Sequence, residues 1–228
     1  MKRLVATVRR DLKLLYRNGF FHAAAVVAGI LILVLRALPP DFAAWLLPLA
    51  LLGNFVTNGF YFAAGMMLLE KAERTLDVQF ATPLRSAEYV GAKIVALSLL
   101  TLVETGVIVV ASGHSRYLLL GLSTVALTAV LGQLGLLMVT RYRSINEFLM
   151  PSVLVMYAVM LPAVDLLGLW DSALLYFHPL YPPMVLLEAA FRPVSGLETV
   201  VALVLTAAWI AVGMAISQRV IGRFATTP

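Results

Sequence analysis

Six apolar runs, each long enough to cross a membrane, make up most of this chain. They occupy residues 20–38, 42–69, 94–111, 118–139, 148–169 and 197–216. A helix rises about 1.5 Å per residue, so that about 20 apolar residues cross a hydrocarbon core of ~30 Å. The hydrophobic share of the chain is 61%, far above that of a soluble domain. We therefore expect an all-α integral membrane protein with six transmembrane helices, folded as a single transmembrane domain over residues 1–228.

Two further segments have the pattern of helices that do not cross. Residues 1–19 are strongly basic, and Leu4, Val8, Leu12 and Leu15 fall on one helical face, which predicts a helix lying in the membrane interface. A basic flank that only sets the topology is the alternative. Residues 172–191 are apolar but are interrupted in the middle by three prolines, so we expect a re-entrant hairpin of two short helices outside the cell.

The basic side chains indicate the orientation. Fourteen Lys and Arg residues precede the first run or follow the second, fourth and sixth runs, whereas three, Arg36, Arg116 and Arg192, lie on the other side. The positive-inside rule places the richer side in the cytoplasm. We predict a multi-pass protein of the cell membrane with both termini cytoplasmic. The net charge of +5 then reflects this asymmetry and contact with anionic lipid, and it requires no nucleic acid.

Ionisable residues crowd the segment between the second and third runs, residues 70–93, which reads EKAERTLDVQFATPLRSAEYVGAK. Leu76 and Phe80 share a helical face at i, i+4, and acidic and basic side chains surround them. The dipeptide Thr82-Pro83 ends such a helix, and we expect Ser86 to be the N-cap of the next one, with Glu88 in its first turn. The segment therefore predicts a short transverse helix and a turn.

The order of residues in this segment resembles that of the type-two ATP-binding-cassette exporter permeases. The matching residues are Glu70, Glu73, Thr75-Leu76-Asp77, Thr82-Pro83-Leu84, Glu88 and Gly91-Ala92-Lys93. Two positions depart from that family: Arg74 stands where Gly is usual, and Asp77 where Glu is commoner. Within the family the chain is most similar to the fluoroquinolone export permeases, on the stretches RNGFFHAAA, LLEKAERTL and RYRSINEFLMPS.

This resemblance implies the transmembrane subunit of an exporter whose ATPase is a separate chain. ATP and Mg²⁺ would bind to that ATPase, and we expect no cofactor on this chain, which contains no Gly-x-x-x-x-Gly-Lys-Ser/Thr phosphate loop. Segment 70–93 would be the coupling helix. The residues expected to couple to the ATPase are Glu73, Thr75, Leu76, Asp77, Phe80, Thr82, Pro83 and Arg85. A second cytoplasmic contact is expected at Arg141 and Arg143.

Six helices in one chain leave little room for a drug route among themselves, so we expect a second permease subunit, in a homodimer or a heterodimer. The resemblance implies export as the direction of transport. The few charges inside the spans favour hydrophobic or amphipathic small molecules as substrates, with drug efflux as the expected activity.

Polar residues inside the spans are the candidates for a substrate route. Glu104 lies near the middle of the third span, where a carboxylate is costly, so that it is either protonated, bonded to a neighbouring helix, or in contact with a charged substrate. Asn54, Asn58 and Tyr61 follow one another along the second span and either join helices or line the same route. Gln133 is expected to join helices.

Three smaller features favour structural roles. Ser144 and Glu147 form a Ser-x-x-Glu capping box at the start of the fifth span. His178 is expected to pack within the hairpin, because the chain has no Cys and its three His are scattered, which leaves no metal site. The sequence also lacks the paired carboxylates of an intramembrane hydrolase.

The main alternative to an exporter subunit is an ATP-independent channel or ion-coupled carrier that uses Glu104. That alternative assigns no role to the organised segment 70–93.

Overall fold

The computed structural model describes residues 2–76, 79, 84–112, 116–169 and 172–226, and every regular element in them is helical. In chain order, the first elements are α1 (Lys2–Arg17), α2 (Phe20–Ala37), α3 (Pro40–Phe55), the π-helical segment η1 (Val56–Tyr61), α4 (Phe62–Ala72), α6 (Ser86–Ser112), α7 (Tyr117–Val139) and α8 (Ile145–Val159). The chain ends with α9 (Ala163–Leu166), the 3₁₀ segment η2 (Ala173–Phe177), α10 (Tyr181–Phe191) and α11 (Gly196–Thr226).

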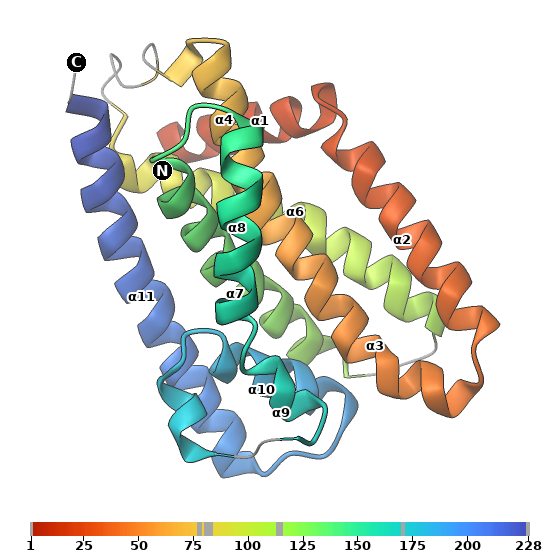
Figure 1. Cartoon of the computed structure of the whole chain (residues 1–228). Coiled ribbons are helices and arrows are strands. Elements are labelled where there is room, and N and C mark those ends of the chain that lie inside the picture. The colour runs from red at the N-terminus through yellow and green to blue at the C-terminus, as the bar shows by residue number, and fades with distance from the viewer. Residues whose placement is uncertain (1, 77–78, 80–83, 113–115, 170–171, 227–228) are drawn as a thin grey trace.

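The long helices run alternately up and down, so that both termini lie at the same end of the bundle (Figure 1). The end of α4 and the connection from α7 to α8 also lie there, while the short helices α9 and α10 lie at the opposite end. Among the described residues, five helical stretches are long and apolar enough to cross a membrane: 20–37, 40–72, 86–111, 117–139 and 196–223. An all-α multi-pass membrane fold is thus confirmed.

The fifth predicted span, 148–169, is not one helix. The helix α8 has 15 residues, about 22 Å at 1.5 Å per residue, and a turn separates it from the four-residue helix α9. Pro162 causes the break, because it has no N–H to continue the helix and disfavours helical backbone in the residue before it. Pro162 inside this span indicates a kink or hinge, and the structure breaks the helix completely at that point.

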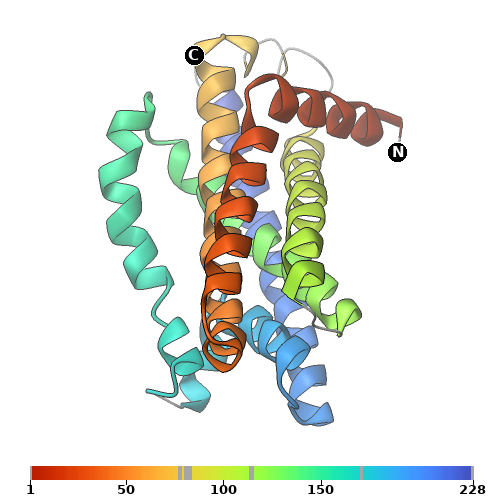
Figure 2. The same cartoon turned by 90° about the vertical axis from the view of Figure 1, so that its right-hand side faces the viewer.

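The basic N-terminal segment is a helix, as predicted, and it lies across the end of the bundle in both views (Figure 2). Gly19, with φ 80°, forms the corner between α1 and α2, and such a left-handed backbone favours glycine. Leu15 is fully buried, while Arg9 on another face of α1 is exposed. The amphipathic pattern of residues 1–19 therefore matches the side of α1 that packs on α2 and α6.

The second span contains a π-helical segment, Val56–Tyr61, which the sequence did not predict. The central helix α7 packs closely against it. A Cβ on Gly59 would lie 2.9 Å from Cβ of Leu131, and a Cβ on Gly135 would overlap the carbonyl oxygen of Phe60. Small residues allow this close approach of two helix backbones, as is common in membrane proteins.

The prolines divide the segment 172–191 into two short helices, as predicted. The first is the 3₁₀ segment η2, and the second, α10, begins at Tyr181 with Pro182 and Pro183 in its first turn, where the missing N–H groups cost no helical hydrogen bond. Nearly all of α10 is buried, and it packs against α7 and α11.

Candidate functional site

The end of α4, at the same end of the bundle as both termini, is where the charged side chains converge. Glu70 is fully buried. Its carboxylate accepts hydrogen bonds from Lys93 Nζ at 2.8 Å, from the Tyr89 hydroxyl at 2.6 Å and from Arg10 at 3.3 Å. Because Lys93 and Tyr89 belong to α6 and Arg10 to α1, this one carboxylate holds three helices together.

A second carboxylate, Asp11 of α1, completes the group. It accepts a hydrogen bond from Arg10 at 2.9 Å and lies 3.8 Å from Lys93 Nζ. The side chains of Asp11, Glu70 and Lys93 are all fully buried. We call Arg10, Asp11, Glu70, Tyr89 and Lys93 the buried ion cluster. Charges removed from water require such pairing, since an unpaired buried charge costs several kcal/mol.

The next residue, Lys71, reaches in another direction. Its ammonium group donates to the backbone carbonyl oxygens of Val139 at 2.9 Å, Thr140 at 3.3 Å and Tyr142 at 2.9 Å. These carbonyls lie at the C-terminal end of α7, where helix carbonyls have no partner within the helix and a positive charge is favourable. Lys71 therefore ties the end of α4 to the start of the connection between α7 and α8.

The backbone after α4 turns sharply at Arg74, which has φ 53°. This left-handed conformation favours glycine. The position is the one at which the resemblance expects Gly, so that the structure explains the preference and shows that Arg is held in the same conformation. Glu73, beside it, accepts two hydrogen bonds from Arg17 of α1 at 3.2 and 3.3 Å.

The predicted coupling residues fall into three groups. Leu76 is 3% exposed within the hydrophobic core, so it anchors the segment to the bundle, and Thr75 donates to the Glu70 carbonyl at 3.3 Å. Arg85 is exposed at the start of α6. Glu73 is half-exposed and bonded to Arg17. The other four, Asp77, Phe80, Thr82 and Pro83, lie outside the described residues. Thr75, Leu76 and Gln79 have helical backbone, which agrees with a short helix.

The start of α6 differs in detail from the prediction. Ser86 is the first residue of the helix and not its N-cap. Glu88 instead accepts a hydrogen bond from the backbone N–H of Arg85 at 3.0 Å, so its carboxylate caps the helix. The helix also begins eight residues before the predicted span at 94, which makes residues 86–93 part of the long helix α6.

The second predicted contact, Arg141 and Arg143, is exposed at the same end of the bundle. The capping box beside it is confirmed: Glu147 N–H donates to Ser144 Oγ at 3.3 Å, and the Glu147 carboxylate accepts from Arg143 N–H at 3.0 Å. Lys71 binds the carbonyls directly before these arginines, so the two predicted contact regions are joined to each other.

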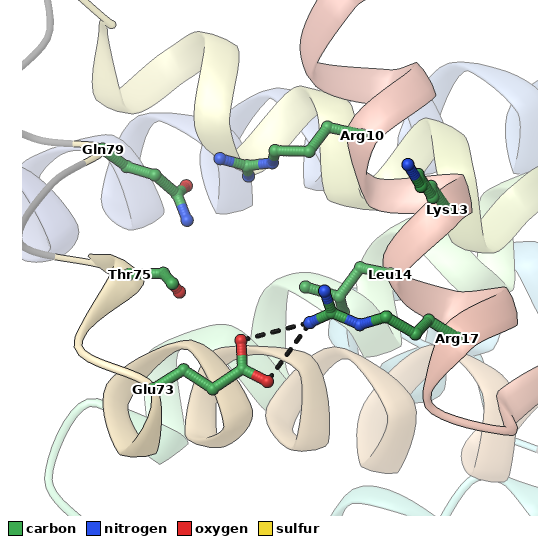
Figure 3. A pocket seen from close by; sticks show the side chains of 7 residues that line it. All are labelled: Arg10, Lys13, Leu14, Arg17, Glu73, Thr75 and Gln79. Atoms are coloured by element: carbon green, nitrogen blue, oxygen red, sulfur yellow. Dashed lines mark hydrogen bonds and ion pairs between the residues drawn. The ribbon is translucent and has the colours of Figure 1, made fainter.

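A cleft of about 380 Å³ lies between α1 and the segment that follows α4 (Figure 3). Figure 3 shows the α1 side chains facing those of the segment across an open space. The lining residues are Arg10, Lys13, Leu14, Arg17, Glu73, Thr75 and Gln79. The lining thus carries three cationic side chains and one carboxylate.

The candidate substrate-route residues do not form one site. Glu104 is 5% exposed and accepts a hydrogen bond from the Asn58 side chain, which bonds it to a neighbouring helix, and Asn54 is equally buried in the same span as Asn58. Tyr61 contacts Phe60 and Phe148 instead. It lines a groove of about 620 Å³ formed by α2, the end of η1, α4 and the start of α8.

The residues expected to be structural are bonded accordingly. Gln133 donates to the Ile210 carbonyl at 3.1 Å, which joins α7 to α11. His178 Nδ1 accepts from the Leu180 N–H at 3.2 Å, and burial lowers the pKa of this imidazole. In the part of the chain that the structure describes, no three His, Cys, Asp or Glu side chains are grouped to hold a metal ion.

Three residues of the site were not singled out from the sequence. Tyr89 and Lys71 carry no pattern that marks them. Asp11 carries a recognisable pattern, because it precedes the buried Leu15 by four residues and so lies on the apolar face of a basic helix. An acidic side chain on a buried face requires a cationic partner.

Comparison with known proteins identifies the family. The sequence pattern of the fluoroquinolones export permease protein family matches residues 2–227. Fluoroquinolones export permease proteins from two strains of Mycobacterium tuberculosis, CDC 1551 / Oshkosh and ATCC 25618 / H37Rv, are each 35% identical to this chain over 206 residues, covering 86% of the chain and 84% of each relative. The chain belongs to the fluoroquinolones export permease protein family.

Proposed function

We propose that this chain is the permease subunit of an ATP-driven exporter that moves fluoroquinolone-like and other hydrophobic or amphipathic small molecules out of the cell. ATP and Mg²⁺ bind to a separate cytoplasmic ATPase, and two permease subunits form the route. Both termini face the cytoplasm. Membership of an export permease family supports transport as the activity, and the two relatives are named for fluoroquinolones.

The observation that carries the coupling part of the proposal is the pair Glu70 and Lys71 at the end of α4. Glu70 holds α1 and α6 through the buried ion cluster, and Lys71 holds the carbonyl end of α7. A force applied near this end is thus transmitted to four helices together. Rigid-body movement of that kind is a common way for one subunit to switch another. An ion-coupled carrier has no need for such a joint.

The ATPase would contact exposed side chains beside this joint. Arg85, Arg141 and Arg143 are exposed there, and the buried Leu76 fixes the coupling segment to the bundle, so that movement of the segment moves α4. Arg141 and Arg143 form the second contact, and Lys71 connects them to the first.

The substrate class follows from the groove between α2, α4 and α8. Its volume of about 620 Å³ suits a drug-sized molecule, and its lining is aromatic and aliphatic apart from Arg143 and Ser144 at one end. An apolar aromatic compound with one anionic group fits this distribution. Glu104, which is buried and bonded to Asn58, serves mainly to hold α6 against the second span.

Transport in inside-out membrane vesicles tests the proposal. Vesicles that contain this chain and its ATPase should accumulate a fluoroquinolone when ATP and Mg²⁺ are supplied, and vesicles with either chain alone should not. Arg141→Glu should weaken ATPase association and uptake, while Arg36→Glu, the same charge reversal at the opposite end, is the matched control. Uptake that proceeds without ATP and follows an ion gradient would support the carrier instead.

A further inference from the structure

The cleft between α1 and the segment after α4 is cationic on one wall. Arg10, Lys13 and Arg17 lie at i, i+3 and i+7 along α1, on the side of the helix that lines the cleft. Figure 3 shows Arg10 and Arg17 extending toward the segment, while Lys13 stays beside α1. Glu73 is engaged by Arg17. Arg10 is paired with Asp11 and Glu70 in the buried ion cluster. Lys13 is therefore the cation of this lining that no described carboxylate pairs, and its charge favours an anionic occupant.

The hydrogen-bond donors of the cleft are not all used. Lys13 makes no ion pair with any described residue, and Arg10 Nε is buried without an acceptor among them, although the rest of the Arg10 guanidinium bonds Asp11 and Glu70. A buried donor without an acceptor costs about 1–3 kcal/mol. Ammonium and guanidinium groups both bind phosphate oxygens through charge-assisted hydrogen bonds.

A second cavity continues from the cleft along α1. It has a volume of about 620 Å³ and is lined by Val5, Ala6, Arg9, Arg10 and Lys13, so that Arg10 and Lys13 form part of both cavities. Val5 is 66% exposed. A ligand that spans the two cavities meets cationic groups in both, since Arg9 also lines the second, and beside Val5 and Ala6 it meets a small apolar part of α1. This combination suits an amphipathic anion.

The place of α1 in the fold indicates where this anion comes from. The helix lies across the end of the bundle (Figure 2), and Tyr16, 65% exposed, contacts Phe21 and His22 at the corner with α2. Exposed aromatic residues at the ends of spans typically lie at the level of lipid head groups. An acidic protein segment would satisfy the cations but would leave Val5 uncovered.

We propose that the cleft binds the phosphate of an anionic glycerophospholipid from the adjacent leaflet, held between Arg10 and Lys13, with the lipid's glycerol and acyl portion along Val5 and Ala6. The site lies on the joint that connects α1 to the coupling segment. Binding requires no ATPase, so it can be measured on the permease alone, and its failure would leave the proposed export function untouched.

The test reconstitutes the full chain into lipid nanodiscs of phosphatidylcholine with a minor fraction of phosphatidylglycerol and counts retained phosphatidylglycerol by native mass spectrometry. Lys13→Gln should lower affinity for phosphatidylglycerol about fivefold, the equivalent of the roughly 1 kcal/mol that one basic residue contributes near an anionic surface. Lys13→Arg should retain the lipid. Arg219→Gln, the same loss of charge on the exposed end of α11, should not change it. The melting temperature of each variant verifies folding.

Four results would overturn the proposal. Equal losses for Lys13→Gln and Arg219→Gln would mean diffuse attraction to the surface, and no loss for either would mean no site. Displacement of phosphatidylglycerol by inorganic phosphate at equal concentration would mean a site for free phosphate. Unchanged lipid binding together with loss of ATPase association in Lys13→Gln would assign the cleft to an acidic protein partner.

Discussion

Replacing Lys71 with methionine tests the joint at the end of α4. The substitution keeps an unbranched apolar side chain and removes the ammonium group that donates to the carbonyls of Val139, Thr140 and Tyr142 at 2.9, 3.3 and 2.9 Å. Hydrogen bonds from a charged donor contribute about 1.5–3 kcal/mol each, and water recovers part of that because Lys71 is only partly buried. We therefore expect Lys71→Met to lower the free energy of unfolding by about 2–4 kcal/mol.

The assay is chemical denaturation of the detergent-solubilised protein, followed by circular dichroism. Lys71→Arg keeps the charge and should lose less than half of that amount, because a guanidinium can still bond some of the carbonyls. Lys13→Met, which removes an exposed ammonium with no described ion-pair partner, should stay within about 0.5 kcal/mol of the wild type. If Lys71→Met matched Lys13→Met, the three contacts would carry no stability and the reasoning would be refuted.

Four further substitutions test separate parts of the structure. Arg74→Gly should stabilise the protein by about 1 kcal/mol, because glycine adopts φ 53° without strain, whereas Arg74→Val should destabilise it; equal melting curves would contradict this. Gly135→Ala should lower the free energy of unfolding by about 1–3 kcal/mol, because the added Cβ overlaps the Phe60 carbonyl. Gly106→Ala is the control and should not destabilise the protein, because the space around Gly106 is open. Glu70→Gln should lower the free energy of unfolding by about 3–5 kcal/mol, because it leaves the buried Lys93 poorly paired. Adding Lys93→Met should restore part of that loss. If the effects of the two substitutions simply added, the two side chains would not interact. Glu104→Gln should reduce uptake of charged and neutral drugs alike, and a selective effect on charged drugs would instead place Glu104 on the substrate route.

The sequence predicted the helical spans well because membrane crossing is governed by length and hydrophobicity, both of which can be counted. It also predicted the capping box at Ser144, because local spacing determines such a box. It predicted that Gln133 joins two helices, because an amide buried in the membrane needs a hydrogen-bond partner on a neighbouring helix. Pro162 indicated a kink or hinge within span 148–169 but not a complete break, because proline is often tolerated within membrane helices.

The buried ion cluster could be predicted only in part. Glu70 and Lys93 belong to the motif that carried the resemblance, but their pairing joins residues 23 positions apart through a turn, and Asp11 and Arg10 come from a helix 60 positions earlier. Such contacts depend on how α1 lies across the bundle, which no local pattern specifies. The π-helical segment was missed for the same reason, since its extra residue follows from the close approach of α7 at Gly59 and Gly135.

The identity of what co-purifies with this chain tests the central claim most directly. Tagged protein should be extracted gently from its native membrane, and the accompanying proteins identified by mass spectrometry, in parallel with a Phe80→Asp variant of the predicted coupling helix and a Val5→Asp control on α1. We predict a separate ATP-binding chain in stoichiometric amount with the native protein and with the control, and its loss from Phe80→Asp. Absence of any ATPase, under conditions that preserve other membrane complexes, would contradict an ATP-driven exporter and favour a carrier that works alone.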